Sequence, residues 1–175
     1  MLIAQQEYAT LKRMRLAGSQ EDAAAEVLVE MGFRQGSVGF VDQPGALGEA
    51  EFARKCQFAT ADGSSHEVDL AVGLPGRIIL ALECKVSNDR TNSVKRTNDV
   101  LKKAEAWSRQ WGRFVVTAAL LEGVFSEKEP RRLVEAGVEI FWSHRLDLLR
   151  QYLAGKGTPT SRRRGSTRSR GTGRG

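Results

Sequence analysis

The sequence predicts an α/β (α+β) sandwich, in which helices flank a central mixed β-sheet. Three segments between residues 51 and 87 show strand-like alternation and are separated by turn residues, which predicts an antiparallel meander. From residue 93 onward, helical periodicity alternates with short apolar runs, the pattern of successive helices and strands. The chain therefore combines an antiparallel start with a helix–strand–helix–strand–helix continuation.

Residues 1–48 are predicted to form an N-terminal helical region and a connector. Helical spacing covers residues 3–16, and Ser19 is placed to N-cap a second helix that runs to Met31. The stretch 35–48 is rich in glycine and interrupts this periodicity. We therefore expect it to lead into the core without forming a long element.

Residues 49–154 are predicted to form the core. Its first strands carry alternating apolar residues, and its longest helix has apolar residues at helical spacing that include Trp107 and Trp111, which are expected in the core. Strands are expected up to Thr60 and over 67–72, 78–86, 114–121 and 138–142, and helices over 93–111, 126–136 and 144–153.

Burial determines the expected register of the second and third strands. Their apolar residues lie at even positions, so even positions must pair with even positions if one face is buried. A three-residue loop at 75–77 satisfies this condition and places Asp69 opposite Glu83 and Glu67 opposite Lys85. A two-residue loop would put Glu83 into the core, which is costly for a carboxylate.

Asp69, Glu83 and Lys85 carry the candidate chemistry. Opposed residues have Cβ atoms about 4.5–5.5 Å apart, so the two carboxylates repel each other unless a cation lies between them. Mg²⁺ prefers one or two carboxylates with further oxygens, which the Cys84 carbonyl could add. Lys85 could orient water or offset developing charge, and Glu67 is either its structural partner or an accessory ligand. The alternative is a surface salt-bridge cluster on a half-exposed sheet.

Polar and basic residues follow the third strand and suit phosphate or base contacts. They lie in a loop and on the basic stripe of the following helix, close to the proposed site. His66 and His144 are expected to be structural or surface groups. The candidate DNA-binding residues are Asn88, Arg90, Asn92, Ser93, Lys95, Arg96 and Lys102.

The stretch from Glu83 to Arg96 reads ECKVSNDRTNSVKR. With Asp69 upstream, it resembles the PD-(D/E)xK nuclease superfamily, although Val68 stands where a proline usually precedes the aspartate. The longer string, with the later segments GVF and IFWSH, resembles type II restriction endonucleases of the XamI kind over about residues 51–153.

This resemblance implies a restriction-endonuclease-like sandwich in which Asp69 and Glu83 bind Mg²⁺ and Lys85 is catalytic. It also implies an additional acid on a helix before the first core strand, for which Glu51 and Glu49 are candidates. The implied function is Mg²⁺-dependent hydrolysis of phosphodiester bonds in double-stranded DNA by a type II restriction endonuclease. A homodimer would suit a palindromic target, and a cognate DNA methyltransferase is the expected partner. The alternatives are a repair or junction-resolving nuclease of the same superfamily and a catalytically inactive DNA-binding module.

Charge and composition restrict the remaining possibilities. The formal charge is +6, but residues 155–175 carry +7 and no acid, which leaves −1 for residues 1–154. This Arg/Gly-rich tail is predicted to be disordered and either adds nonspecific DNA affinity or is uninvolved. With no long apolar run, no signal-peptide pattern and only two cysteines, the sequence predicts a cytoplasmic protein outside the membrane.

Overall fold

The computed structural model describes residues 18–157. The helix predicted over residues 3–16 and nearly all of the predicted basic tail lie outside this range. Within it, no helix is both long enough and apolar enough to cross a membrane.

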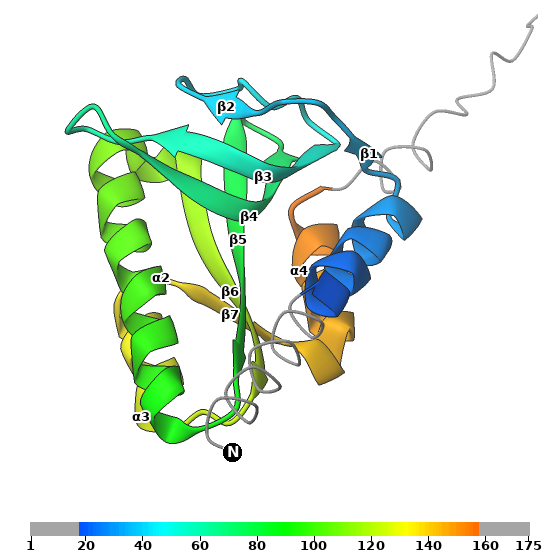
Figure 1. Ribbon diagram of the computed structural model, residues 1–175. Helices are drawn as coiled ribbons and strands as arrows, with labels where there is room; N and C mark the ends of the chain where they lie inside the picture. Colours follow the sequence, from blue (N-terminus) through cyan, green and yellow to red (C-terminus); the bar gives the residue numbers. More distant parts are fainter. Residues whose placement is uncertain (1–17, 158–175) are drawn as a thin grey trace, which may run out of the picture.

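A mixed seven-stranded sheet forms the middle layer (Figure 1). The strand order is β1-β3-β4-β5-β6-β7, with β2 also paired to β3. The β3–β4–β5 meander is antiparallel as predicted, whereas β1 and β2 run parallel to β3, and β6 and β7 extend the sheet in parallel from β5. The strands are β1 Arg34–Gln35, β2 Phe40–Val41, β3 Glu51–Ala59, β4 Ser65–Leu74, β5 Ile78–Ser87, β6 Val115–Gly123 and β7 Glu139–Trp142.

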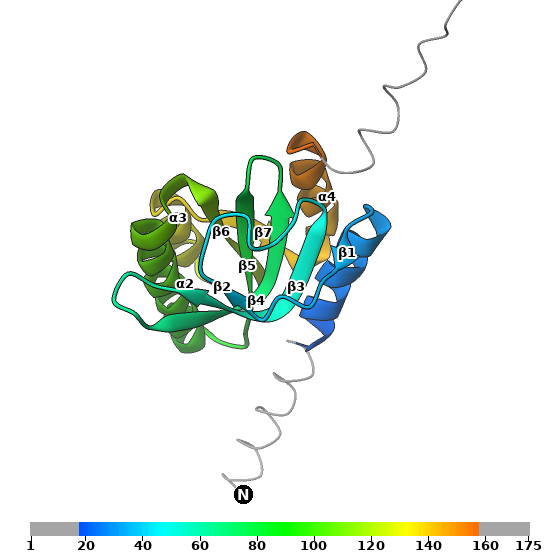
Figure 2. The same ribbon diagram turned by 90° about the horizontal axis from the view of Figure 1, so that it is seen from above.

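Helices cover both faces of this sheet, which confirms the predicted α+β sandwich. Viewed from above, helix 18–30 and α4 lie on one side of the sheet, and α2 and α3 lie on the other (Figure 2). Each side has its own apolar cluster, one around Leu28 and Leu82 and the other around Phe58 and Trp107. The remaining elements are α2 Arg90–Trp111, α3 Lys128–Glu135, α4 Leu146–Gly155 and short 3-10 turns at Gly112–Phe114 and Ser143–Arg145.

Two predicted helix starts are wrong. Residues 18 and 19 are already helical, so Ser19 is not an N-cap. Helix α2 begins three residues earlier than predicted because Asp89 caps it, with Asp89 Oδ1 accepting the Asn92 N–H at 2.8 Å. On this helix Ser93 is buried, whereas Val94 is 41% exposed.

The predicted register of β4 and β5 is confirmed over the part of the hairpin next to its loop. Leu70 pairs with Leu82 and Leu74 pairs with Ile78, and the loop consists of residues 75–77. The ladder ends at the Leu70–Leu82 pair, so the strands part just before the predicted pairing of Asp69 with Glu83.

The even positions of β3 and β4 do not share one face, contrary to the prediction. Phe52 and Leu70 pack under helix 18–30, whereas Cys56 and Val68 pack in the cluster with Trp107. In both strands the even-numbered side chains switch from one face of the sheet to the other at the same level, where Lys55 has a left-handed φ of 51°. This change of phase occurs beside Asp69, at the level where β4 leaves β5.

Candidate active site

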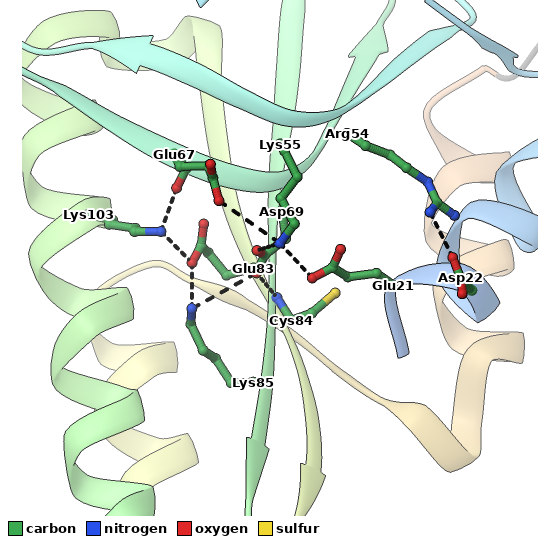
Figure 3. A network of polar contacts seen from close by, with 10 residues as sticks. All are labelled: Glu21, Asp22, Arg54, Lys55, Glu67, Asp69, Glu83, Cys84, Lys85 and Lys103. Carbon is green, nitrogen blue, oxygen red and sulfur yellow. Dashed lines mark hydrogen bonds and ion pairs between the residues drawn. The ribbon is translucent and has the colours of Figure 1, made fainter. Parts of the chain in front are cut away.

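Seven charged side chains gather where β4 parts from β5, between α2 and helix 18–30 (Figure 3). Four are acids and three are lysines, and they come from both helices and from β3, β4 and β5. They are Glu21, Lys55, Glu67, Asp69, Glu83, Lys85 and Lys103. The three predicted core residues of the site, Asp69, Glu83 and Lys85, therefore lie together.

Asp69 is fixed by the backbone of the neighbouring strand. Its Oδ2 accepts the Cys84 N–H at 2.8 Å, in the place where a β4 carbonyl would continue the ladder. Because the N–H and C=O of one residue point to the same side of a strand, the Cys84 carbonyl also faces this side of β5. Where the ladder ends, the Asp69 carboxylate therefore takes the place of a backbone hydrogen-bond acceptor and lies on the same side of β5 as the Cys84 carbonyl.

Glu83 is fully buried and is held by two lysines. Its Oε2 accepts hydrogen bonds at 2.8 Å from both Lys85 Nζ and Lys103 Nζ. Its Oε1 is buried and has no hydrogen-bond partner among residues 18–157. A buried acceptor without a donor is costly, so this oxygen is suited to a cation or another donor.

Lys85 lies between the two carboxylates, with Nζ 2.8 Å from Glu83 Oε2 and 3.9 Å from Asp69 Oδ2. Burial lowers the pKa of its ammonium, but attraction to Glu83 and Asp69 outweighs burial, so the pKa lies above its usual range. Lys85 is therefore charged at neutral pH and is suited to donate hydrogen bonds and offset negative charge.

The Asp69 carboxylate is ionised at neutral pH. Burial raises its pKa, but the charge of Lys85, the hydrogen bond from Lys55 and the Cys84 N–H lower it further, and the net pKa lies below the ordinary value. An ionised carboxylate in a partly buried position is the form that binds a metal cation.

The donor set fits a divalent cation. Four carboxylates face three ammonium groups, which leaves a formal deficit of one positive charge. No group of three or more His, Cys, Asp or Glu side chains within residues 18–157 is arranged to hold an ion on its own. Mg²⁺ needs only one or two carboxylates when water or phosphate oxygens complete its octahedron, and Asp69 and Glu83 can supply those two.

Other predicted residues lie differently. Glu51 accepts hydrogen bonds from Arg34 at 3.1 Å and from the Gly48 N–H at 3.3 Å, outside the cluster. Glu67 is not opposite Lys85, because the ladder has ended, and its carboxylate lies 4.0 Å from Lys55 Nζ.

Three residues of the cluster were not predicted as site residues. Glu21 lies on the same face of helix 18–30 as the buried Ala24 and Leu28, three and seven residues before them. An acidic residue on an otherwise apolar helix face was the signal available in the sequence. Lys103 lies on the helix predicted to carry a basic stripe, but its Nζ contacts the Glu83 carboxylate and the Glu67 carbonyl. Lys55 carried no signal, because its direction depends on its left-handed backbone.

The candidate DNA-contacting residues divide into two groups. Ser93 is buried and donates to the Arg90 carbonyl at 2.7 Å, so the prediction that it contacts DNA is wrong. Asn92 contacts the Asp89 carboxylate at the helix cap. Arg90 and Lys95 line a shallow groove at the start of α2. The other residues of the set are exposed or half-buried, namely Asn88, Arg96 and Lys102.

The chain is similar to known restriction endonucleases. The family profile described as XamI restriction endonuclease matches residues 1–142. The type II restriction enzyme XamI of Xanthomonas campestris pv. amaranthicola is 34% identical over 117 residues, which cover 64% of this chain and 40% of that enzyme. The chain thus spans less than half the length of this relative.

The fold is similar to that of a solved structure from another protein. The crystal structure of protein VC1899 from Vibrio cholerae superimposes with a TM-score of 0.53 at 12% identity, covering 81% of this chain and 34% of that one. At this level of identity the likeness concerns the fold alone.

Proposed function

The chain belongs to the XamI restriction endonuclease family, and from this premise we propose that it is a Mg²⁺-dependent endonuclease that cuts double-stranded DNA at specific sites. The observation that carries the proposal is the convergence of Asp69, Glu83 and Lys85 where β4 leaves β5. Two ionisable carboxylates and a charged lysine at one point of the sheet suit phosphodiester hydrolysis.

Each residue has a distinct role in this proposal. Asp69 and Glu83 would hold Mg²⁺, with the Cys84 carbonyl as a further oxygen. When bound there, Mg²⁺ supplies an acidified water and offsets charge on the scissile phosphate. Lys85 donates hydrogen bonds to the attacking water or to a phosphate oxygen. Attraction to Glu83 and Asp69 holds its pKa above the ordinary value, which suits this role as a hydrogen-bond donor.

Glu21 takes the part of the accessory acid that the sequence placed at Glu51 or Glu49. Its carboxylate is largely buried and reaches Asp69 through Lys55, which contacts both acids at 2.7 Å. An acid in this position adds negative charge beside the proposed metal site. Its carboxylate would also be placed to accept a hydrogen bond from water at that site.

The substrate and partners follow from the same premise. A palindromic target would require two copies of the site, related by two-fold symmetry, so we propose a homodimer on double-stranded DNA. A DNA methyltransferase with the same target would protect the host genome. The homodimer and the methyltransferase are both proposed as parts of a complete restriction system.

Plasmid cleavage tests the proposed function. Purified protein incubated with plasmid and Mg²⁺ is expected to give discrete fragments, and EDTA is expected to abolish them. A smear would indicate a nuclease without site preference. A mobility shift without cutting would indicate an inactive DNA-binding module and overturn the proposal.

The groove at the start of α2 gives a second prediction. Arg90→Gln and Lys95→Gln should each reduce the dependence of log K on log salt for DNA binding by about one, because each removes one phosphate contact. Arg113→Gln is a matched control that also removes one charge. It lies past the far end of α2, whose 22 residues span about 33 Å. Equal slopes for all variants would show that the groove does not contact phosphate.

A further inference from the structure

Lys55 occupies the space between two carboxylates of the site. Its Nζ lies 2.7 Å from Asp69 Oδ1 and 2.7 Å from Glu21 Oε1 (Figure 3). The other Asp69 oxygen accepts the Cys84 N–H. Both oxygens of Asp69 therefore already have a donor.

The backbone directs Lys55 into this position. Its φ of 51° is left-handed, a conformation that residues with a long side chain rarely adopt. The side chains of Arg54 and Lys55, neighbours in β3, consequently both reach helix 18–30, where Arg54 pairs with Asp22 at 2.7 Å. Ordinary strand alternation would send them to opposite faces.

A divalent cation on Asp69 would conflict with this lysine. An ion about 2.0–2.1 Å from Oδ1 would lie within a few ångströms of the Lys55 ammonium, and the two positive charges would repel each other. Lys55 can leave, because its side chain is 47% exposed. Lys85 and Lys103 are more enclosed and bind the opposite acid, Glu83.

We propose that Lys55 is an internal counter-ion that lies between Glu21 and Asp69 when no divalent cation is bound and turns out to solvent when one binds. This inference rests on the proposed metal site at Asp69. It implies that Lys55 weakens metal affinity and sets the Mg²⁺ concentration that the site requires, while stabilising the metal-free protein.

Metal titration tests the inference without cleavage. Isothermal titration of the chelator-treated full chain with Mn²⁺ should show that Lys55→Met binds about tenfold more tightly or better than the wild type, since a competing charge is gone. Lys55→Arg keeps the charge and should bind like the wild type. Arg113→Gln, a control for net charge, should also bind like the wild type.

The outcomes separate the two proposals. Binding by the wild type with equal or weaker binding by Lys55→Met would overturn the role of Lys55 and leave the proposed metal site standing. No Mn²⁺ binding by either protein would overturn the metal site, and the role of Lys55 with it.

Thermal unfolding provides a second readout. In EDTA, Lys55→Met should unfold at a lower temperature than the wild type, because Glu21 and Asp69 then face each other without their counter-ion. Mn²⁺ should raise its unfolding temperature more than that of the wild type.

If Lys55→Met does not fold, the wild type alone can decide. NMR of ¹⁵N-labelled lysine side chains should show a hydrogen-bonded Lys55 ammonium that moves to a solvent-exposed signal on addition of Mg²⁺. A Lys55 signal that is unchanged at saturating Mg²⁺ would refute displacement.

Discussion

Asp69→Asn and Glu83→Gln are each expected to reduce the rate of DNA cleavage about a thousandfold or more while leaving the protein folded. Both substitutions keep the shape of the side chain and remove its negative charge. Loss of a metal ligand removes several kcal/mol of transition-state stabilisation, which corresponds to this factor. Single-turnover cleavage at saturating enzyme measures the effect on the chemical step.

Asp22→Asn is the matched control for this prediction. Asp22 also belongs to the polar network but is exposed and pairs with Arg54 at 2.7 Å, outside the carboxylate cluster. Its substitution should leave the cleavage rate within about a factor of three, since exposed ion pairs contribute little. Near wild-type cleavage by Asp69→Asn or Glu83→Gln would refute the assignment of the metal ligands.

The choice of glutamine at position 83 matters for the fold. Glu83 is buried between Lys85 and Lys103, each 2.8 Å from Oε2. An alanine there would leave two lysines without their acid, and breaking a buried pair in this way costs about 3–5 kcal/mol, reduced here by the partial exposure of both lysines. Glutamine keeps an oxygen in place, so loss of activity can be separated from loss of stability by comparing circular dichroism and melting temperatures.

Hydrophobic patterning was sufficient to predict the pairing of β4 with β5 near their loop, because register is a consequence of burial. The even-numbered apolar residues of β4 and β5 allowed only the pairing that was observed from Leu70–Leu82 to Leu74–Ile78. That pairing brings Asp69 and Glu83 near each other, and the hydrogen bond from the Cys84 N–H to Asp69 Oδ2 fixes Asp69 where the ladder ends. The antiparallel meander followed from equally local signals, whereas the parallel pairing of β6 with β5 was not predicted.

The pattern could not show where the alternation breaks. At Lys55 a left-handed residue shifts the phase of β3, and β4 shifts with it beside Asp69. Any L-residue can be forced into this conformation by its surroundings, so no residue type marks it in the sequence. Glu21 was missed for another reason. It lies 48 residues from Asp69 along the chain, and only the packing of helix 18–30 on the sheet brings the two together.

The packing of α2 has its own measurable consequence, centred on Trp107. Its side chain is fully buried against Phe58, with ring centroids 5.4 Å apart, and Lys103 lies 5.9 Å above its ring. Trp107→Ala should therefore lower the free energy of unfolding by about 3–5 kcal/mol, as expected for a large buried aromatic residue. Denaturant unfolding monitored by circular dichroism measures the loss.

Phenylalanine distinguishes ring packing from hydrogen bonding at this position. Trp107 Nε1 is buried and has no partner within residues 18–157, whereas Trp111 Nε1 donates to the Ala59 carbonyl at 3.0 Å. Trp107→Phe removes an unsatisfied donor, which offsets about 1–3 kcal/mol of the lost packing, while Trp111→Phe loses a hydrogen bond and leaves a carbonyl without its donor. Trp111→Phe should thus lower the free energy of unfolding more than Trp107→Phe does, although Trp107 is the more deeply buried of the two. The reverse order would show that Trp107 Nε1 has a partner.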